Sequence, residues 1–175
     1  MNSMPAQGSM RQVLEGFYQK LINDEQLLRL LYYYPEDENN PSPLSSELPD
    51  IIGSDIYWDI VDERILDVEK DSDLQDKPLC RIYITPERRR AVFGNYLQAK
   101  QGVEISVFVH EDYSGDKRIE WISDRIFEIL SLSRIDGAFG KIEYVKGDPW
   151  VAPVQYQLYK HVFEYYGEKN RTYRN

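Results

Sequence analysis

The sequence predicts an α+β domain, with a mostly antiparallel sheet of about four strands, an amphipathic helix across one face, and an N-terminal helical pair. Two patterns predict this fold class. From Val103 to His110 apolar side chains alternate with others, which is the period of a strand with one face in the core. From Ile119 to Leu130 isoleucines and leucines recur at helical spacing. We expect one domain over residues 10–166.

The N-terminal part predicts two helices at an angle. Residues 1–9 are expected to be a flexible arm that orders only on a partner. Apolar side chains at spacings of one, three and four predict a helix over residues 10–22. Asn23 or Asp24 then supplies an N-cap for a shorter, leucine-rich helix that runs through Leu31.

A proline-rich segment follows at residues 34–53. Its prolines, mixed with Asp, Asn and Ser, exclude a continuous helix and predict a loop of about twenty residues. Two interpretations have equal weight: a disordered insertion in a monomer, or a loop that reaches onto a neighbouring subunit in an assembly. Residues 55–66 carry a mixed apolar pattern, which fits either a strand or a short helix.

A strand is predicted from Leu79 to Ile84 by its β-branched and aromatic content, ended by Pro86. Beyond it, three consecutive arginines precede aromatic residues. Guanidinium groups pair with phosphates, so this stretch has the chemistry to bind a nucleic-acid backbone. In so acidic a chain we favour a solvated turn or a strip of salt bridges, and a subunit contact would use the same residues. The stretch contains Arg88, Arg89, Arg90, Phe93, Gly94 and Tyr96.

The C-terminal half predicts the remainder of the sheet. After the strand that ends at His110, residues 111–116 form a turn and lead into the amphipathic helix, which ends near Ser131. A strand is expected over residues 141–146, a turn at Gly147-Asp148-Pro149, and a long final strand over 154–166. A polar tail occupies residues 167–175.

Both faces of the final strand are apolar. Even-numbered positions, which share one face of the strand, include Tyr156, Leu158 and Val162. Odd-numbered positions, on the other face, include Tyr159, Phe163 and Tyr165. The strand therefore needs a cover on each side, and we expect the helix to supply one and another subunit to supply the second.

Composition limits the function. The 175 residues include 21 basic and 30 acidic side chains, and the net charge of −9 disfavours general binding to nucleic acid or to an anionic membrane. The sequence contains neither a long apolar run nor a signal peptide, so we expect a cytoplasmic protein without a membrane span. Cys80 is the single cysteine, which excludes an intramolecular disulfide.

Motifs for catalysis or for metal binding are weak. His110-Glu111-Asp112 are consecutive, so a strand cannot direct all three to one side. The calcium-loop spacing that starts at Asp112 fails, because Lys117 stands where glycine is required and Ser123 where glutamate is required. His161 has no obvious nucleophile beside it, and a packed or interface histidine is expected. We therefore expect no enzyme activity, no cofactor and no metal.

Several stretches together resemble a known protein family. They are Cys80-Arg81-Ile82-Tyr83-Ile84, the strand from Glu104 to His110, the helix start Asp116-Lys117-Arg118-Ile119, and the ending from Tyr156 to Tyr166. In this order, after a leucine-rich N-terminal helix, they resemble the tail-terminator and tail-completion proteins in the neck of tailed bacteriophages. The resemblance covers residues 10–166, and the proline-rich segment departs from it.

The resemblance implies a structural role. Members of that family are α+β proteins that form hexameric rings, stop the polymerisation of the tail tube and dock the head-tail connector. It thus implies a virion protein of the tail and neck, assembled in the bacterial cytoplasm, whose partners are itself, the tail tube protein and the connector. DNA would pass through the acidic lumen without specific binding.

The subunit or partner contacts expected on this basis combine the arginine stretch with aromatic residues of the last strands. They are Arg88, Arg89, Arg90, Tyr96, Trp150, Tyr156, Tyr159 and Phe163. Two other functions are kept as alternatives. One is another head-tail connector or head-completion component, and the other is a small phage-encoded hydrolase or nuclease.

Overall fold

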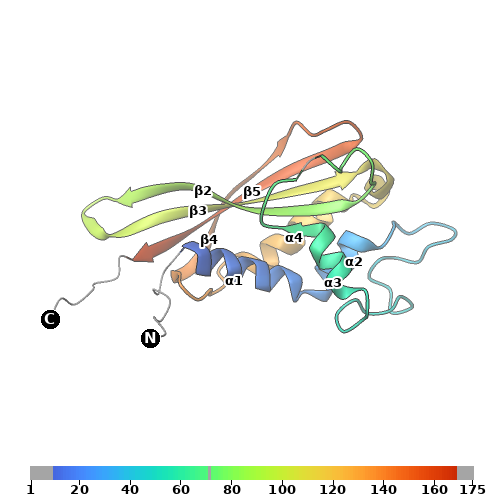
Figure 1. Cartoon of the computed structure of the whole chain (residues 1–175), viewed down its shortest axis with the longest axis horizontal. Helices are drawn as coiled ribbons and strands as arrows, with labels where there is room; N and C mark the ends of the chain where they lie inside the picture. Colours follow the sequence, from blue (N-terminus) through green and yellow to red (C-terminus); the bar gives the residue numbers. More distant parts are fainter. Residues whose placement is uncertain (1–9, 71, 169–175) are drawn as a thin grey trace.

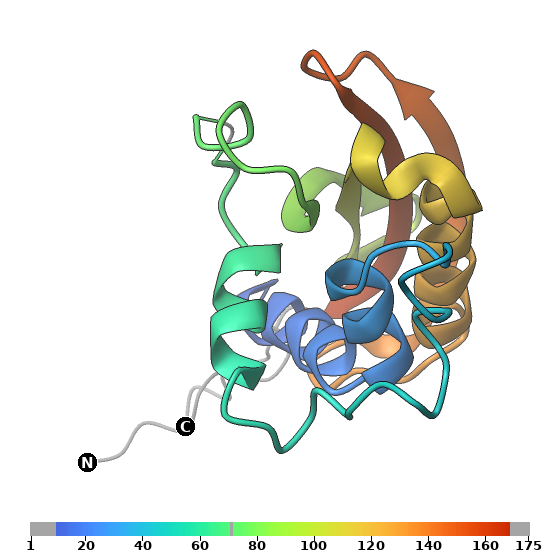
Figure 2. The same cartoon turned by 90° about the vertical axis from the view of Figure 1, so that its right-hand side faces the viewer.

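The computed structural model describes residues 10–70 and 72–168, and its two layers confirm the predicted α+β class. A five-stranded sheet in the order β1-β2-β3-β5-β4 forms one layer, antiparallel except for the parallel pair β1–β2. The helices lie together on one face of the sheet (Figures 1 and 2). The main core fills the space between the two layers.

Along the chain, three helices precede three strands, and two further helices precede the last two strands. The helices are α1 (Met10–Ile22), α2 (Glu25–Tyr32), α3 (Tyr57–Arg64), the 3₁₀ helix η1 (Glu111–Asp116) and α4 (Arg118–Leu130). The strands are β1 (Ile65–Leu66), β2 (Cys80–Val92), β3 (Asn95–His110), β4 (Phe139–Trp150) and β5 (Tyr156–Glu168).

The predicted helical pair and the predicted amphipathic helix are confirmed. On α1, Val13, Phe17 and Leu21 are fully buried at the expected spacing. Asp24 is the N-cap of α2, where its side chain accepts a hydrogen bond of 2.8 Å from the backbone N–H of Leu27. Residues 55–66, for which the sequence left two alternatives, contain both: α3 and then the short strand β1.

Two predicted strand ends are wrong, and both involve proline. The strand that starts near residue 79 does not end at Pro86; β2 continues to Val92, with a register shift between Pro86 and Arg89. The turn predicted at 147–149 lies inside β4, where Pro149 pairs with Tyr159. At these prolines both strands lie at an edge of the sheet. In an edge strand a proline can face outward, where its missing N–H breaks no hydrogen bond with a neighbouring strand.

The chain itself covers part of the second face of the sheet, and cover by another subunit stays a prediction for the remainder. Leu74 and Leu79, from the segment between β1 and β2, are buried against Tyr83, Phe108 and Leu158. This small second core occupies one end of the face.

Arg81 holds this covering segment in place. Its guanidinium donates to the carbonyl oxygens of Glu63 and Lys70 at 2.8 and 3.1 Å, and to the carboxylate of Asp73 at 2.7 and 3.0 Å. The side chain is only 2% exposed, so its charge depends on these partners.

Two further buried arginines cap the C-terminus of α2. The last carbonyl groups of a helix have no partner within it, and they form the negative end of the helix dipole. Arg118 of α4 donates to the carbonyl oxygens of Leu30 and Tyr33, and Arg64 of α3 donates to that of Leu31. Three helices that are distant in sequence are thereby joined at one point.

The proline-rich segment at 34–53 is attached to its own chain. Arg29 of α2 donates to the carbonyl oxygens of Ser45 and Leu48 at 2.8 and 2.9 Å, and to the carboxylate of Asp50 at 2.7 Å. Glu25 accepts from the backbone N–H groups of residues 51 and 52, at 2.8 Å each. An ordered loop that packs on α2 therefore replaces the disordered insertion, and contact of this loop with a neighbouring subunit stays a prediction.

Arg29→Ala is expected to release this loop without unfolding the domain. The free energy of unfolding should fall by about 2 kcal/mol, and cleavage after Glu47 by a glutamate-specific protease should accelerate roughly tenfold. The measurement pairs urea denaturation with timed proteolysis. Arg134→Ala, at an exposed position, should change neither, and an equal rate in both variants would contradict the role assigned to Arg29.

Candidate assembly surface

A long hairpin projects beyond the helical layer. We call residues 86–102, the ends of β2 and β3 that meet at Phe93 and Gly94, the arm (Figure 1). Gly94 has a φ of 77°, a conformation that suits glycine at a tight hairpin turn. The side chain of Phe93 at the tip is fully exposed, and that of Leu97 is 40% exposed.

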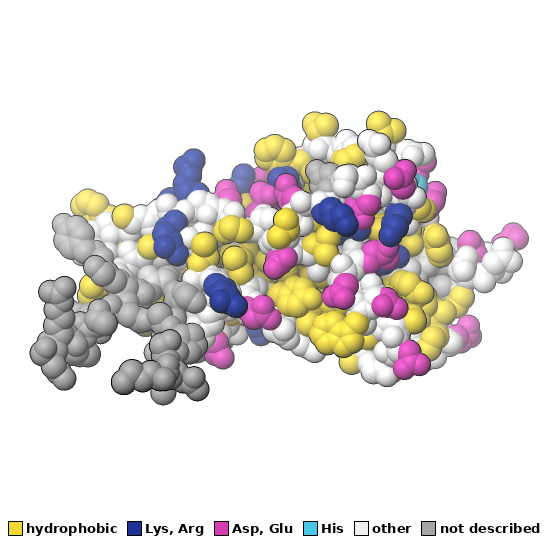
Figure 3. Space-filling view, in the orientation of Figure 1, with side chains coloured by type: hydrophobic (Ala, Val, Ile, Leu, Met, Phe, Trp, Pro, Cys, Tyr) yellow, Lys and Arg dark blue, Asp and Glu magenta, His cyan; other side chains and the backbone are white. Residues whose placement is uncertain are grey.

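The arm is basic on an acidic protein. It contains the three consecutive arginines and Lys100, against Glu87 as its one acidic residue, whereas the whole chain has a net charge of −9. Figure 3 shows Lys and Arg side chains along the arm and hydrophobic side chains at its far end. Such a separation of charge within one chain favours contact between unlike surfaces.

The arginine stretch lies in a strand rather than in the turn that the sequence favoured, although part of it forms the predicted strip of salt bridges. Arg90 forms an ion pair with Glu164 of β5, and Arg89 donates to Gln101 at 2.8 Å. Lys100 bridges Glu143 and Glu164 at 2.9 and 3.0 Å. Hydrogen bonds to these carboxylates, that of Glu143 first, raise the pKa of Lys100.

Arg88 differs from its two neighbours. Its side chain is exposed, and none of the described residues forms an ion pair or a hydrogen bond with it, whereas Arg89 has Gln101 and Arg90 has Glu164. The backbone of Tyr96 belongs to β3, but its side chain lies outside the described part of the structure. Of the three arginines, Arg88 therefore has the guanidinium group that is most available to a partner.

The predicted aromatic contacts lie at the opposite end of the sheet. Trp150 is 57% exposed, and the ammonium of Lys160 lies 4.9 Å from its ring centroid. Tyr156 donates from its hydroxyl to the carbonyl of Lys77 at 2.6 Å, and Tyr159 is half-buried. By strand spacing Tyr159 and Tyr156 are roughly 15 and 25 Å from the arm along β5. The structure therefore does not join the two sets.

Phe163 belongs to the chain's own core. It is fully buried, and its ring centroid lies 6.1 Å from that of Phe17 in an edge-to-face arrangement. A partner has no access to this side chain in the folded subunit.

His161 lies in a buried aromatic cluster between the rings of Tyr144 and Tyr159. Its Nδ1 is 3.2 Å from the hydroxyl of Tyr144, and no polar group among the described residues contacts its Nε2. Burial lowers the pKa of His161 to about 4. Of the two interpretations from the sequence, the packed histidine is the one that this placement supports.

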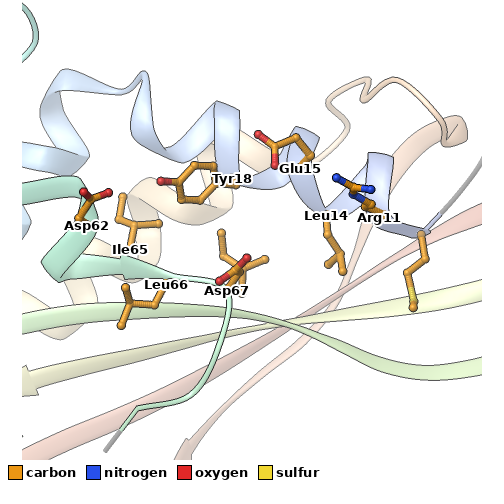
Figure 4. A pocket seen from close by; sticks show the side chains of 10 residues that line it. Arg11, Leu14, Glu15, Tyr18, Asp62, Ile65, Leu66 and Asp67 are labelled. Atoms are coloured by element: carbon orange, nitrogen blue, oxygen red, sulfur yellow. The ribbon is translucent and has the colours of Figure 1, made fainter. Parts of the chain in front are cut away.

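A groove runs beside the base of the arm. It has a volume of about 690 Å³ and lies between α1 on one side and the end of α3 with β1 on the other (Figure 4). We call it the α1–β1 groove. Its apolar floor and walls are Met10, Leu14, Tyr18, Ile65, Leu66 and Ile84.

The polar lining of the groove is mainly acidic. Glu15 from α1 and Asp62 and Asp67 from the opposite side line it together with Arg11 (Figure 4). This negative charge affects Tyr18. Its pKa is raised mainly by burial, and Asp62 and Glu15 raise it further. The groove thus combines an apolar interior with excess negative charge.

The described residues hold neither a cluster of metal ligands nor a reactive thiol. Among residues 10–70 and 72–168, no three His, Cys, Asp or Glu side chains are arranged to hold a metal ion. Burial raises the pKa of Cys80 to about 12, so its thiol does not ionise at neutral pH. Within the same residues, no helix is long and apolar enough to cross a membrane.

Sequence reasoning missed the α1–β1 groove, although α1 carried a signal for it. Met10, Leu14 and Tyr18 recur every four residues, beside the buried stripe of the same helix. These three side chains form a second apolar stripe and are only partly buried. The opposite wall comes from residues 62–67, and their proximity depends on the tertiary fold.

Comparisons with known proteins agree with the fold. The family model described as YomW matches residues 24–165. Among solved structures, the fold is similar to a chain of the virion of the native gene transfer agent (GTA) particle, with a TM-score of 0.54 and 13% identity. That similarity covers 90% of this chain and 96% of the other. No curated protein matches.

Proposed function

The chain belongs to the YomW family, and from this membership and the likeness of its fold to a virion chain we propose that it is a structural protein of a phage-type virion. The observation that carries the proposal is the extent of that likeness. It includes nearly all of both chains, so it concerns the whole subunit rather than one shared motif. Fold alone does not determine function, and the surfaces of this chain supply the second argument.

Within the virion, we assign the protein to the neck as a tail terminator. Its copies form a ring, with six as the expected number, that caps the tail tube and docks the head-tail connector. The sheet supports such assembly. Only the two residues of β1 pair with the outer side of β2, and from Ile84 onward no described strand continues there. An open edge invites pairing, and a closed ring covers it.

The charge of the chain suits a channel for DNA. A net charge of −9 repels phosphate groups, so the duplex would slide through the ring without sticking. In this arrangement the basic arm lies at subunit contacts, because a basic surface in the lumen would hold the DNA.

The first test is the mass of the purified protein by light scattering, followed by electron microscopy of negatively stained particles. The expected result is a closed ring, either alone or on addition of tail tubes. A protein that stays a monomer at high concentration and does not bind tail tubes would overturn the neck assignment.

A second test separates the terminator from other neck components. Removal of the gene should give tail tubes without length control, together with heads that carry no tail. Tubes of normal length that fail to join heads would instead identify a connector or head-completion component.

A further inference from the structure

We propose that the arm of one copy docks in the α1–β1 groove of a second copy, so that successive subunits join head to tail. This inference rests on the proposed function and specifies its subunit contact. The occupant of the groove is thus a described segment of the same chain, with exposed Phe93 at its tip and basic residues behind it.

Charge is the first argument. The groove is lined by Glu15, Asp62 and Asp67 against Arg11, whereas the arm carries three arginines and Lys100 against Glu87. Arg88 has no ion-pair partner among the described residues, so it is available for a carboxylate of another copy. Complementary patches of this kind direct association and select its orientation.

Apolar matching is the second argument. Among the described residues, fully exposed Phe93 has no side chain to pack against, and the groove offers Leu14, Ile65 and Leu66 as walls. An apolar tip in such a pocket, with charges around it, has the arrangement of an interface hot spot. The 690 Å³ of the groove leaves ample room for an aromatic ring.

Dimensions are the third argument. Arg88, the arginine available to a partner, precedes Phe93 by five residues, so it lies roughly 17 Å behind the tip on an extended strand. On the other surface, Met10 and Tyr18 mark a length of about 12 Å along α1. With Phe93 at one end of the groove, the arm therefore spans its full length and brings Arg88 to the rim at the other end.

The position of the two surfaces makes the contact repeatable. Ile84 lines the groove, and the arm begins two residues later on the same strand. A subunit that receives one arm thus presents its own arm from the adjacent surface. Because donor and acceptor surfaces differ, the contact is heterologous, and such contacts generate rings when the rotation closes.

Disulfide trapping tests the contact directly. The variants are Ala91→Cys on the arm, an exposed position that leaves Phe93 in place, and Glu15→Cys at the rim of the groove. Buried Cys80 does not interfere because its thiol is inaccessible. We expect mixed single variants to form a cross-linked heterodimer at least about tenfold faster than either variant alone. A chain with both substitutions should form a ladder of cross-linked oligomers.

The matched control places the cysteine on the other hairpin. Val151→Cys is similarly exposed, at 94%, near the tip between β4 and β5. Equal yields with Ala91→Cys and Val151→Cys would overturn the proposal. Rapid homodimers of Ala91→Cys alone would also overturn it, because they indicate contact between like surfaces.

Charge reversal tests the electrostatic part. Arg88→Glu on the arm should slow trapping about fivefold, and Asp67→Lys in the groove partner should restore it. Deletion of residues 169–175, which carry Lys169, Arg171 and Arg174, should leave trapping unchanged. If the deletion instead accelerates trapping strongly, that basic tail occupies the groove and the arm assignment fails.

The outcomes separate this inference from the proposed function. If the wild-type protein forms rings but the arm does not cross-link to the groove, the contact is wrong and the virion role stands. If arm and groove cross-link but rings never bind tail tubes, the contact stands and the neck assignment is wrong.

Discussion

Replacement of Arg118 by methionine is expected to destabilise the protein by about 3–5 kcal/mol, the largest single effect that we predict. Arg118 is fully buried, and it donates to Leu30, Tyr33 and the Asp116 carboxylate, the last at 2.8 Å. Methionine fills most of the space but leaves two carbonyl oxygens and one carboxylate without their donor. The measurement is the free energy of unfolding in urea at pH 7.

A matched control lies on the same helix. Arg125→Met removes an ion pair with Asp24, in which both side chains remain partly exposed. Solvent screens that pair, so the expected loss is about 1 kcal/mol. If the two variants lose the same free energy, the buried capping of α2 by Arg118 is not the source of stability.

The second large effect is a dependence of stability on pH that comes from His161. The histidine titrates near its ordinary pKa of 6.5 in the unfolded chain and at about 4 in the folded one. The contribution of His161 to the free energy of unfolding is complete above pH 6.5. It is lost as the pH falls toward 4, because the unfolded chain takes up a proton at a higher pH than the folded chain does. The predicted loss between pH 6.5 and pH 4 is about 3 kcal/mol.

His161→Gln isolates this contribution from that of the carboxylates. Unfolding free energies of the wild type and the variant are measured from pH 7 to pH 4, and their difference should shrink by about 3 kcal/mol toward the acidic end. Tyr144→Phe removes the hydroxyl that contacts Nδ1 but keeps the site buried, so it should preserve the slope. A wild type and a His161→Gln variant with parallel profiles would contradict the assignment.

Local patterns predicted the elements whose periodicity is strong. The alternation through Val103 and Val109 marked β3, and the helical spacing from Ile119 marked α4, because each pattern records one buried face. Proline positions misled the prediction at two strand ends. Whether proline ends a strand depends on whether that strand lies at an edge, and strand order is a property of the whole sheet.

The candidate site was predictable only in part. The sequence indicated a contact role for the arginine stretch, and the structure places it on a projecting arm. It grouped Phe163 with the exposed aromatics, although this side chain is in the core. The alternation of side chains along a strand shows that both of its faces are apolar, but it does not show what covers each face.

The sequence by itself determined the fold class, the helical pair, the central strand and the amphipathic helix, since each depends on the spacing of apolar side chains within about a dozen residues. Only the tertiary structure decided how Arg118 reaches α2 and how the α1–β1 groove forms. The hydrogen bond from Arg118 to Leu30 joins residues 88 apart in the chain. No local pattern records such a contact, because its partners become neighbours only when the layers pack.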